Sequence, residues 1–293
     1  MNFKIILSIF ILFFSFLKAD VFDKKIETPE IIFKNTYKKT IFEKDRIYSD
    51  ITLKSKDFEV INFTVSFPKD LSKAKRILIL IDGLKTSKDV LNYFKPLDDY
   101  ILIGFEFDKT LNYLNSKKSI FHIFSLRKAV LDTPFQVVSL IKWLKTQTWF
   151  KNDPIIMGIS FGAIFVPATY HVAKLNNIDL GPCILAFGGA NIYEIFYANL
   201  NNYFLFRKQI AKIAALIFNP IDPKYHMKYI KPPLLIINGT DDTFIPKKSA
   251  KLLQELANDP KTIINLETKH IMPDNKSLIE KVYNISNEWL KKI

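Results

Sequence analysis

The sequence predicts an α/β fold in which a mostly parallel sheet of about eight strands has helices on both faces. Short apolar runs alternate with helix-like segments through most of the chain, and this alternation is typical of βαβ units. Residues 77–81 are five consecutive apolar β-formers, as expected for a strand covered on both faces. A length of 293 residues and a hydrophobic content of 48% are enough for one large domain with a sizeable core.

The expected elements follow from local patterns. Residues 20–39 are polar and are expected to form a loosely held lead-in. Residues 58–67 alternate apolar and polar side chains from Ile61 to Phe67, which predicts an antiparallel hairpin with residues 47–54 at a sheet edge. Further strands are expected at 77–81, 100–107, 154–157, 183–187, 234–237 and 262–266. Helices are expected around 90–94 and at 120–147, 161–175, 248–257 and 277–292.

The first residues resemble a secretory signal peptide. A short basic start precedes an almost wholly apolar run from Ile5 to Leu17, and Leu17-Lys18-Ala19 offers a cleavage site before Asp20. We therefore expect residues 1–19 to be removed and residues 20–293 to form the mature domain, exported to the periplasm or secreted. The alternative is an uncleaved N-terminal membrane anchor, although the apolar run is short for a span.

The chain carries a formal net charge of +13, which falls to +11 without the two lysines of residues 1–19. We expect no nucleic-acid partner, because the basic residues are scattered and nearly all lysine, whereas base readout favours arginine. Attraction to an anionic membrane surface stays open. The single cysteine, Cys183, lies in an apolar run and is interpreted as a core residue. The sequence makes no prediction of oligomeric state.

The most informative motif is Gly158-Ile159-Ser160-Phe161-Gly162, which stands between an apolar strand and a helix-like segment. A sharp strand-to-helix turn exposes a serine hydroxyl, and it leaves no room for side chains beside it. The first N–H groups of the following helix would face any oxyanion formed there. Ser160 is therefore the candidate nucleophile; the alternative is an ordinary turn that happens to contain serine.

A nucleophilic serine needs a base and an orienting acid. Of the four histidines, His270 comes just past the last predicted strand, where reactive groups of open α/β sheets gather. Residues 234–237 lead into a turn that contains Asp241 and Asp242, so the acid is expected there. The alternative for such a pair of aspartates is plain turn chemistry.

These motifs resemble the α/β-hydrolase superfamily from about residue 77 to the C-terminus, with nucleophile, acid and histidine in that order. The segment from Gly239 to Pro246 is similar to the family's Gly-x-x-Asp-x-x-Val-Pro, which places the acid at Asp242 rather than Asp241. The resemblance implies an acyl-transfer mechanism with a Ser160–Asp242–His270 triad and no cofactor or metal. It implies a small-molecule ester or acyl substrate, most simply a carboxylic ester.

The resemblance also implies an oxyanion hole formed by the N–H groups of Phe161 and Leu84. Here the chain departs from the family, since many members have His-Gly where this sequence has Asp82-Gly83. Because backbone N–H groups bind the oxyanion, the hole can form without His-Gly, but the change affects which acyl groups fit beside it.

Residues 191–229 show no strand pattern and are rich in aromatic and aliphatic side chains. They are expected to form a helical lid over residues 190–230 that shapes the acyl pocket; the alternative is a helix packed on the sheet. Two other functions stay open. One is peptidase, thioesterase or acyltransferase chemistry on the same fold, and the other is a non-catalytic binding protein.

Overall fold

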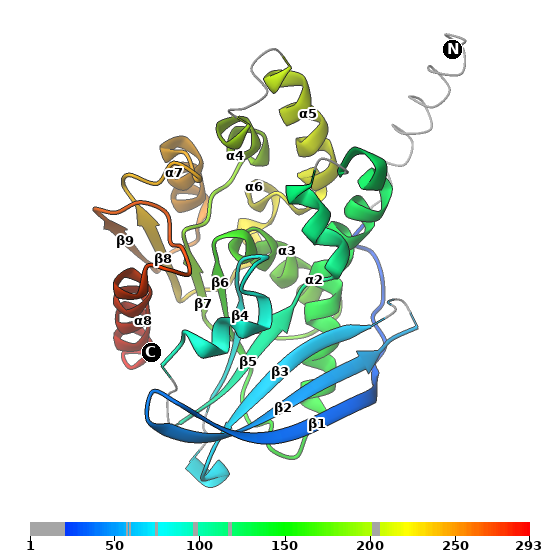
Figure 1. Ribbon diagram of the computed structural model, residues 1–293, viewed down its shortest axis with the longest axis vertical. Helices are drawn as coiled ribbons and strands as arrows, with labels where there is room; N and C mark the ends of the chain where they lie inside the picture. Colours follow the sequence, from blue (N-terminus) through cyan, green and yellow to red (C-terminus); the bar gives the residue numbers. More distant parts are fainter. Residues whose placement is uncertain are drawn as a thin grey trace.

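The computed structural model of the protein describes residues 21–293 except 57, 59, 74–75, 96–98, 117–118 and 201–205. The predicted signal peptide, residues 1–19, therefore lies outside the described residues. In the described part of the chain the strands form one nine-stranded sheet in the order β1-β2-β3-β5-β4-β6-β7-β8-β9 (Figure 1). The predicted α/β fold with a mostly parallel sheet is confirmed.

The six strands from β5 to β9 in this order are parallel to one another. Most are short apolar runs that are buried on both faces, as the sequence predicted. Parallel strands bring all their carboxyl ends to one edge of the sheet, and it is the loops at this edge that carry the candidate site. The strands are β4 (Arg76–Ile81), β5 (Tyr100–Glu106), β6 (Ile155–Ile159), β7 (Cys183–Ala186), β8 (Leu234–Gly239) and β9 (Lys261–Leu266).

Three antiparallel strands extend the sheet beyond β5. They are β1 (Glu30–Ile41), β2 (Lys44–Lys54) and β3 (Ile61–Pro68). The predicted antiparallel pair is present as β2 and β3, but the sheet edge is formed by β1 and not by this pair. The expectation of a loose lead-in over 20–39 is wrong for residues 30–39, which lie in β1. This strand is exposed along nearly its whole length, so its sequence lacks the apolar alternation of a half-buried strand.

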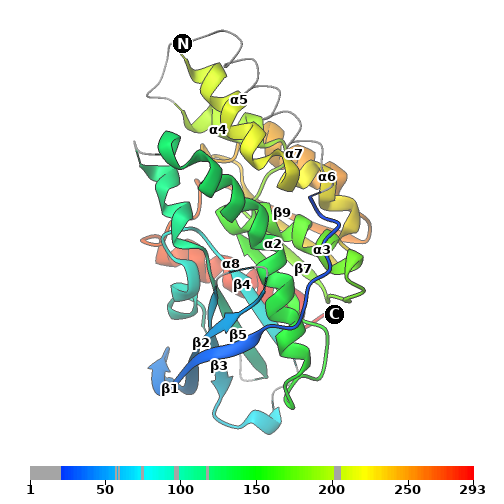
Figure 2. The same ribbon diagram turned by 90° about the vertical axis from the view of Figure 1, so that its right-hand side faces the viewer.

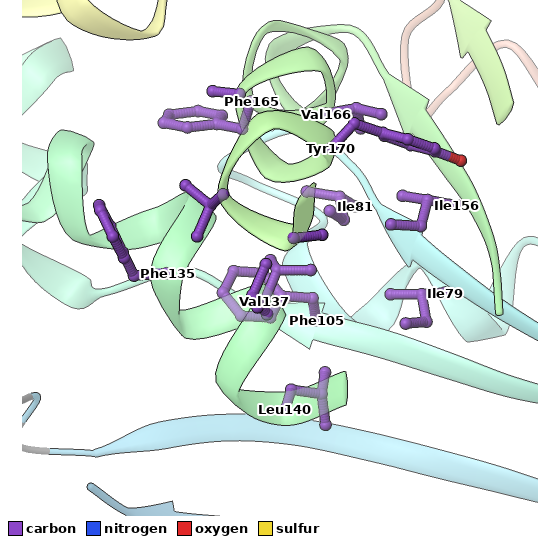
Figure 3. Packing of buried hydrophobic residues seen from close by; sticks show 14 of the residues in the cluster. Ile79, Ile81, Phe105, Phe135, Val137, Leu140, Ile156, Phe165, Val166 and Tyr170 are labelled. Atoms are coloured by element: carbon purple, nitrogen blue, oxygen red, sulfur yellow. The ribbon is translucent and has the colours of Figure 1, made fainter. Parts of the chain in front are cut away.

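Helices cover both faces of the parallel strands. Figure 2 shows α2 (Ile123–Lys145) and α3 (Phe161–Leu175) in front of the sheet and α8 (Lys276–Leu290) behind it. Alternate side chains of β4 enter opposite cores: Ile79 and Ile81 pack with α2 and α3, and Leu80 packs with α8. Figure 3 shows the first of these cores, where residues of α2 and α3 interdigitate with Ile79, Ile81, Phe105 and Ile156.

Residues 191–229 contain helices and, among the described residues, no strand, as predicted. The helices α4 and α5 contact each other at one end of the molecule, and α5 also contacts α2 (Figure 1). In the described residues no helix has the length and apolarity to cross a membrane. The remaining elements are α4 (Ile192–Asn199), α5 (Arg207–Phe218), α6 (Pro223–His226), α7 (Lys247–Leu256), and the 3-10 helices η1 (Leu71–Lys73), η2 (Ser87–Asn92), η3 (Lys109–Asn115), η4 (Ser119–His122), η5 (Asn219–Ile221) and η6 (Met227–Tyr229).

Candidate active site

Ser160 occupies the tight turn between β6 and α3. Its backbone has φ 53° and ψ −117°, a conformation that costs a non-glycine residue free energy and is found mainly at functional sites. A Cβ on Gly162 would lie 1.9 Å from the carbonyl oxygen of Ile81, and one on Gly158 would lie 2.7 Å from the Cα of Ala163. Both glycines are therefore required by close packing, as the motif predicted, and the turn is held against the end of β4.

The structure brings Ser160, His270 and Asp242 together although they lie far apart in the sequence. The Ser160 Oγ lies 2.6 Å from His270 Nε2, and His270 Nδ1 lies 2.7 Å from Asp242 Oδ2. Asp242 and His270 are buried, with exposed fractions of 8% and 7%. If Nδ1 donates its proton to Asp242, Nε2 is free to accept the serine proton, which is the tautomer that a general base requires.

The Asp242 carboxylate has a second set of contacts that fixes its position. Its Oδ1 accepts from the backbone N–H of Phe244 at 2.8 Å and of Ile245 at 2.9 Å. The neighbouring Asp241, whose type is common in turns, does not cap this one with its side chain. Asp241 is exposed, and in the described part of the chain only its backbone N–H has a partner, the Thr268 carbonyl at 3.1 Å. Asp242 therefore both contacts the imidazole and caps the turn.

Two aromatic rings hold the imidazole of His270. The Phe187 ring meets it edge-on at a centroid distance of 5.7 Å, and the exposed Phe244 ring lies at 5.0 Å. The other three histidines contact different parts of the protein. His122 stacks on Tyr113, while His171 and His226 share a contact between their Nδ1 atoms at 3.1 Å.

Phe161 and Leu84, the residues predicted to form the oxyanion hole, both lie beside Ser160. Phe161 is the first residue of α3, so its N–H has no acceptor within the helix. Leu84 lies in the loop after β4, and among the described residues its N–H has no hydrogen-bond acceptor either. Among the described residues, both N–H groups therefore lack a backbone acceptor, and both residues line the same cavity as Ser160.

A cavity of about 570 Å³ opens beside Ser160 and His270. Its walls come from the loop after β4, from η2, from the residues after His270 and from α8. Most of the lining side chains are apolar. The wall residues are Asp82, Gly83, Leu84, Lys85, Thr86, Val90, Tyr93, Phe94, Met157, Ile159, Phe161, Phe244, Ile271, Met272, Pro273, Ile279, Val282 and Tyr283.

None of the described residues of 191–229 lines this cavity, contrary to the expectation that this segment shapes the pocket. The segment instead packs against Phe161: the Phe218 ring lies 6.2 Å from the Phe161 ring, and Phe196 lies 5.0 Å from Phe218. Helix α8 and the 3-10 helix η2 supply the cavity wall that was expected from this segment. Phe204, an aromatic residue of this predicted lid segment, lies outside the described residues.

Asp82 is a site residue whose role was not predicted from the sequence. Burial raises the pKa of its carboxyl to about 6, although hydrogen bonds from the Gly83 N–H and the Thr86 hydroxyl, and the nearby His270, act to lower it. The signal in the sequence was the departure from His-Gly at this position. The burial of this carboxyl in a residue that lines the cavity could not be predicted from the sequence.

Asp82→Asn is expected to stabilise the protein at neutral pH. A carboxyl with a pKa of 3.8 when unfolded and about 6 when folded binds more protons in the folded state, so stability falls as the pH rises through this interval. Two pKa units correspond to about 3 kcal/mol, which is the upper limit of the gain. Urea unfolding of the wild type and of Asp82→Asn, at one pH below and one pH above this pKa interval, measures the gain in stability. The same difference in stability at the two pH values would contradict the burial of the charge.

In the residues that the structure describes, no group of three or more His, Cys, Asp or Glu side chains could hold a metal ion. The single cysteine, Cys183, is fully buried in β7, where burial raises the pKa of its thiol, so it behaves as the predicted core residue.

Comparison with known proteins agrees with this geometry. Residues 145–282 match the sequence family described as Serine hydrolase (FSH1). Among solved structures, the chain is similar to an acetyl xylan esterase from Paenibacillus sp. R4 (12% identity, 94% of this chain and 93% of that one, TM-score 0.62). It is also similar to acetyl xylan esterase 1 from Thermoanaerobacterium sp. JW/SL YS485 (12% identity, 92% of both chains, TM-score 0.61).

A third similar structure is the acylaminoacyl peptidase of Pyrococcus horikoshii, at 13% identity and TM-score 0.58, covering 95% of this chain and 42% of that one. Comparison with curated protein sequences finds no match. The sheet, the serine turn and the structural neighbours together show that the chain has the α/β-hydrolase fold. The sequence match over residues 145–282, which contain both Ser160 and His270, is to a serine hydrolase family.

Proposed function

We propose that the protein is an exported carboxylic-ester hydrolase in which Ser160 is the nucleophile, His270 the general base and Asp242 the orienting acid. The observation that carries this proposal is the continuous hydrogen-bonded chain from Asp242 through His270 to the Ser160 hydroxyl, which ends at the mouth of the cavity. The acetyl xylan esterases among the structural neighbours support an ester as the substrate.

The proposed reaction has two halves. In the first half, Ser160 Oγ attacks the ester carbonyl while its proton passes to His270 Nε2, and the N–H groups of Phe161 and Leu84 bind the oxyanion. Asp242 stays ionised and stabilises the imidazolium. The proton then moves to the leaving alkoxide, which departs as the alcohol. In the second half, water loses a proton to His270 and attacks the acyl-enzyme, and the carboxylic acid is released as Ser160 regains its proton.

A panel of p-nitrophenyl esters from acetate to dodecanoate, tested on the form that begins at Asp20, checks the proposed activity. The mostly apolar walls and the volume of about 570 Å³ favour short and medium acyl chains over long ones. Matched anilide and thioester substrates belong in the same panel. Turnover of an anilide or a thioester with none of any ester would contradict the proposal and favour peptidase or thioesterase chemistry.

Narrowing the cavity from α8 is expected to shift chain-length preference. Ile279 lines the cavity and is only half-buried, so Ile279→Phe should reduce kcat/KM for the longest accepted esters by about ten-fold, while acetate is nearly unaffected. Ile285→Phe is the matched control, because Ile285 lies on the same helix but does not line the cavity. An equal loss on all chain lengths would contradict the assignment of the pocket.

The described residues of 191–229 do not line the cavity, and Phe196 contacts Phe218, which in turn contacts Phe161. Phe196→Ser is therefore expected to lower stability and to leave chain-length preference unchanged. A change in preference larger than the change in stability would instead support a lid that shapes the acyl pocket.

Export rests on the sequence of residues 1–19 alone. Mass spectrometry of the protein from its native host should find an N-terminus at or near Asp20. An intact Met1 on a membrane-bound form would favour the anchor.

A further inference from the structure

Asp82 lines the same cavity as Ser160 and His270 but has no part in the proposed proton transfers. It follows Ile81, whose carbonyl group is in close contact with the serine turn: a Cβ on Gly162 would lie 1.9 Å from that oxygen and 3.0 Å from the Asp82 backbone nitrogen. Ser160, His270 and Asp82 line the same cavity. The position of Asp82 relative to the nucleophile is therefore fixed by backbone packing.

The carboxylate of Asp82 is available to a ligand in the cavity. Its side chain is largely enclosed by protein, and Asp82 as a whole keeps part of its accessible surface and is one of the residues that line the cavity. It accepts hydrogen bonds from the Gly83 N–H and from the Thr86 hydroxyl. Because a carboxylate offers about four acceptor positions, two such bonds leave room for a further donor.

The charge of Asp82 is not neutralised by a neighbouring cation. Of the charged side chains in the described part of the chain, only His270 acts appreciably on this carboxyl, and His270 is already paired with Asp242. Lys85 also lines the cavity, but its side chain is exposed to solvent. A negative charge in a mostly apolar pocket, with no fixed counter-ion, is stabilised by any cation that enters with the substrate.

We propose that Asp82 makes the cavity select esters that carry an ammonium group close to the scissile carbonyl, such as aminoacyl esters, and disfavour esters with a carboxylate there. This inference rests on the proposed ester hydrolase function and names its substrate class. A hydrogen bond between ionised groups in such a site corresponds to a preference of roughly ten- to hundred-fold over a neutral substrate of the same shape.

Isosteric substrates give a direct test. Alanine benzyl ester and isobutyrate benzyl ester differ only by an ammonium in place of a methyl group, and methylmalonate monobenzyl ester places a carboxylate there. Acetylcholine and 3,3-dimethylbutyl acetate form the matching pair for a cation on the alcohol side. In the wild type, the ratio of kcat/KM for cationic and neutral partners should be about ten or more in one of the two pairs.

Asp82→Asn keeps the shape of the side chain and its acceptor for Thr86, and it should bring that ratio close to one. Thr86→Val is the matched control, because it removes a hydrogen bond of the same loop but leaves the charge, so the preference should remain. A wild-type ratio near one in both pairs, or a preference that survives Asp82→Asn in folded protein, would overturn the inference and leave the ester hydrolase proposal standing. If no ester is hydrolysed, the proposed function fails, and this inference fails with it.

Discussion

Replacing Ser160 with alanine is expected to lower kcat for ester hydrolysis by roughly 10⁴- to 10⁶-fold, the range that nucleophile removal gives in serine hydrolases. The substitution removes only the hydroxyl group, whose partner in the described structure is His270 Nε2 at 2.6 Å. The residual rate should come from the oxyanion donors and from binding alone. Stability should not fall, because alanine accepts the packing around the turn and loses no buried hydrogen bond to the core.

The matched control is Ser139→Ala in α2. The Ser139 hydroxyl is buried and has no hydrogen-bond partner in the described structure, so its removal should change neither turnover nor fold. A folded Ser160→Ala protein that keeps more than about a tenth of wild-type kcat would contradict the assignment of the nucleophile, because loss of the nucleophile lowers kcat far more than that.

The second large effect is expected at Asp242. Asp242→Asn should reduce kcat by up to about 10⁴-fold, as the loss of charge does in a comparable triad. The amide oxygen can still accept from the N–H groups of Phe244 and Ile245, as Oδ1 does now, so the turn should persist. The amide nitrogen, however, would face His270 Nδ1 and favour the tautomer that cannot take a proton from Ser160.

Asp241→Asn is the neighbouring control with the same chemical change. Asp241 is exposed, and its backbone rather than its side chain contacts Thr268, so turnover and stability should both stay near wild type. Kinetics on the two purified variants, with circular dichroism to confirm folding, measure the difference. A larger loss of turnover in Asp241→Asn would reverse the assignment of the acid.

The elements that could be predicted from the sequence are those whose cause is local. The serine turn needs Gly158 and Gly162 for steric reasons, and both requirements are visible in five residues. The buried strands could be placed because both of their faces are apolar. The juxtaposition of Ser160 with His270 could be predicted because carboxyl ends of parallel strands meet at one edge of the sheet.

The features that were missed depend on contacts between distant segments. β1 is a strand because it pairs with β2, and its exposed side chains carry no periodic signal. The cavity is walled by α8 and η2 rather than by the described residues of 191–229, and the density of aromatic residues could not reveal which helices flank the serine. The capping role of Asp242 and the enclosure of Asp82 depend on the conformations of two loops, which residue type alone does not determine.

Covalent labelling with a fluorophosphonate tests the central claim most directly, because this reagent reacts with an activated serine and does not depend on the choice of substrate. Intact mass spectrometry of the wild-type protein is predicted to show a single adduct, and peptide mapping should place it on Ser160. Ser160→Ala should show no adduct, and His270→Ala should react far more slowly. An adduct on another residue, or undiminished labelling of folded Ser160→Ala, would contradict the account.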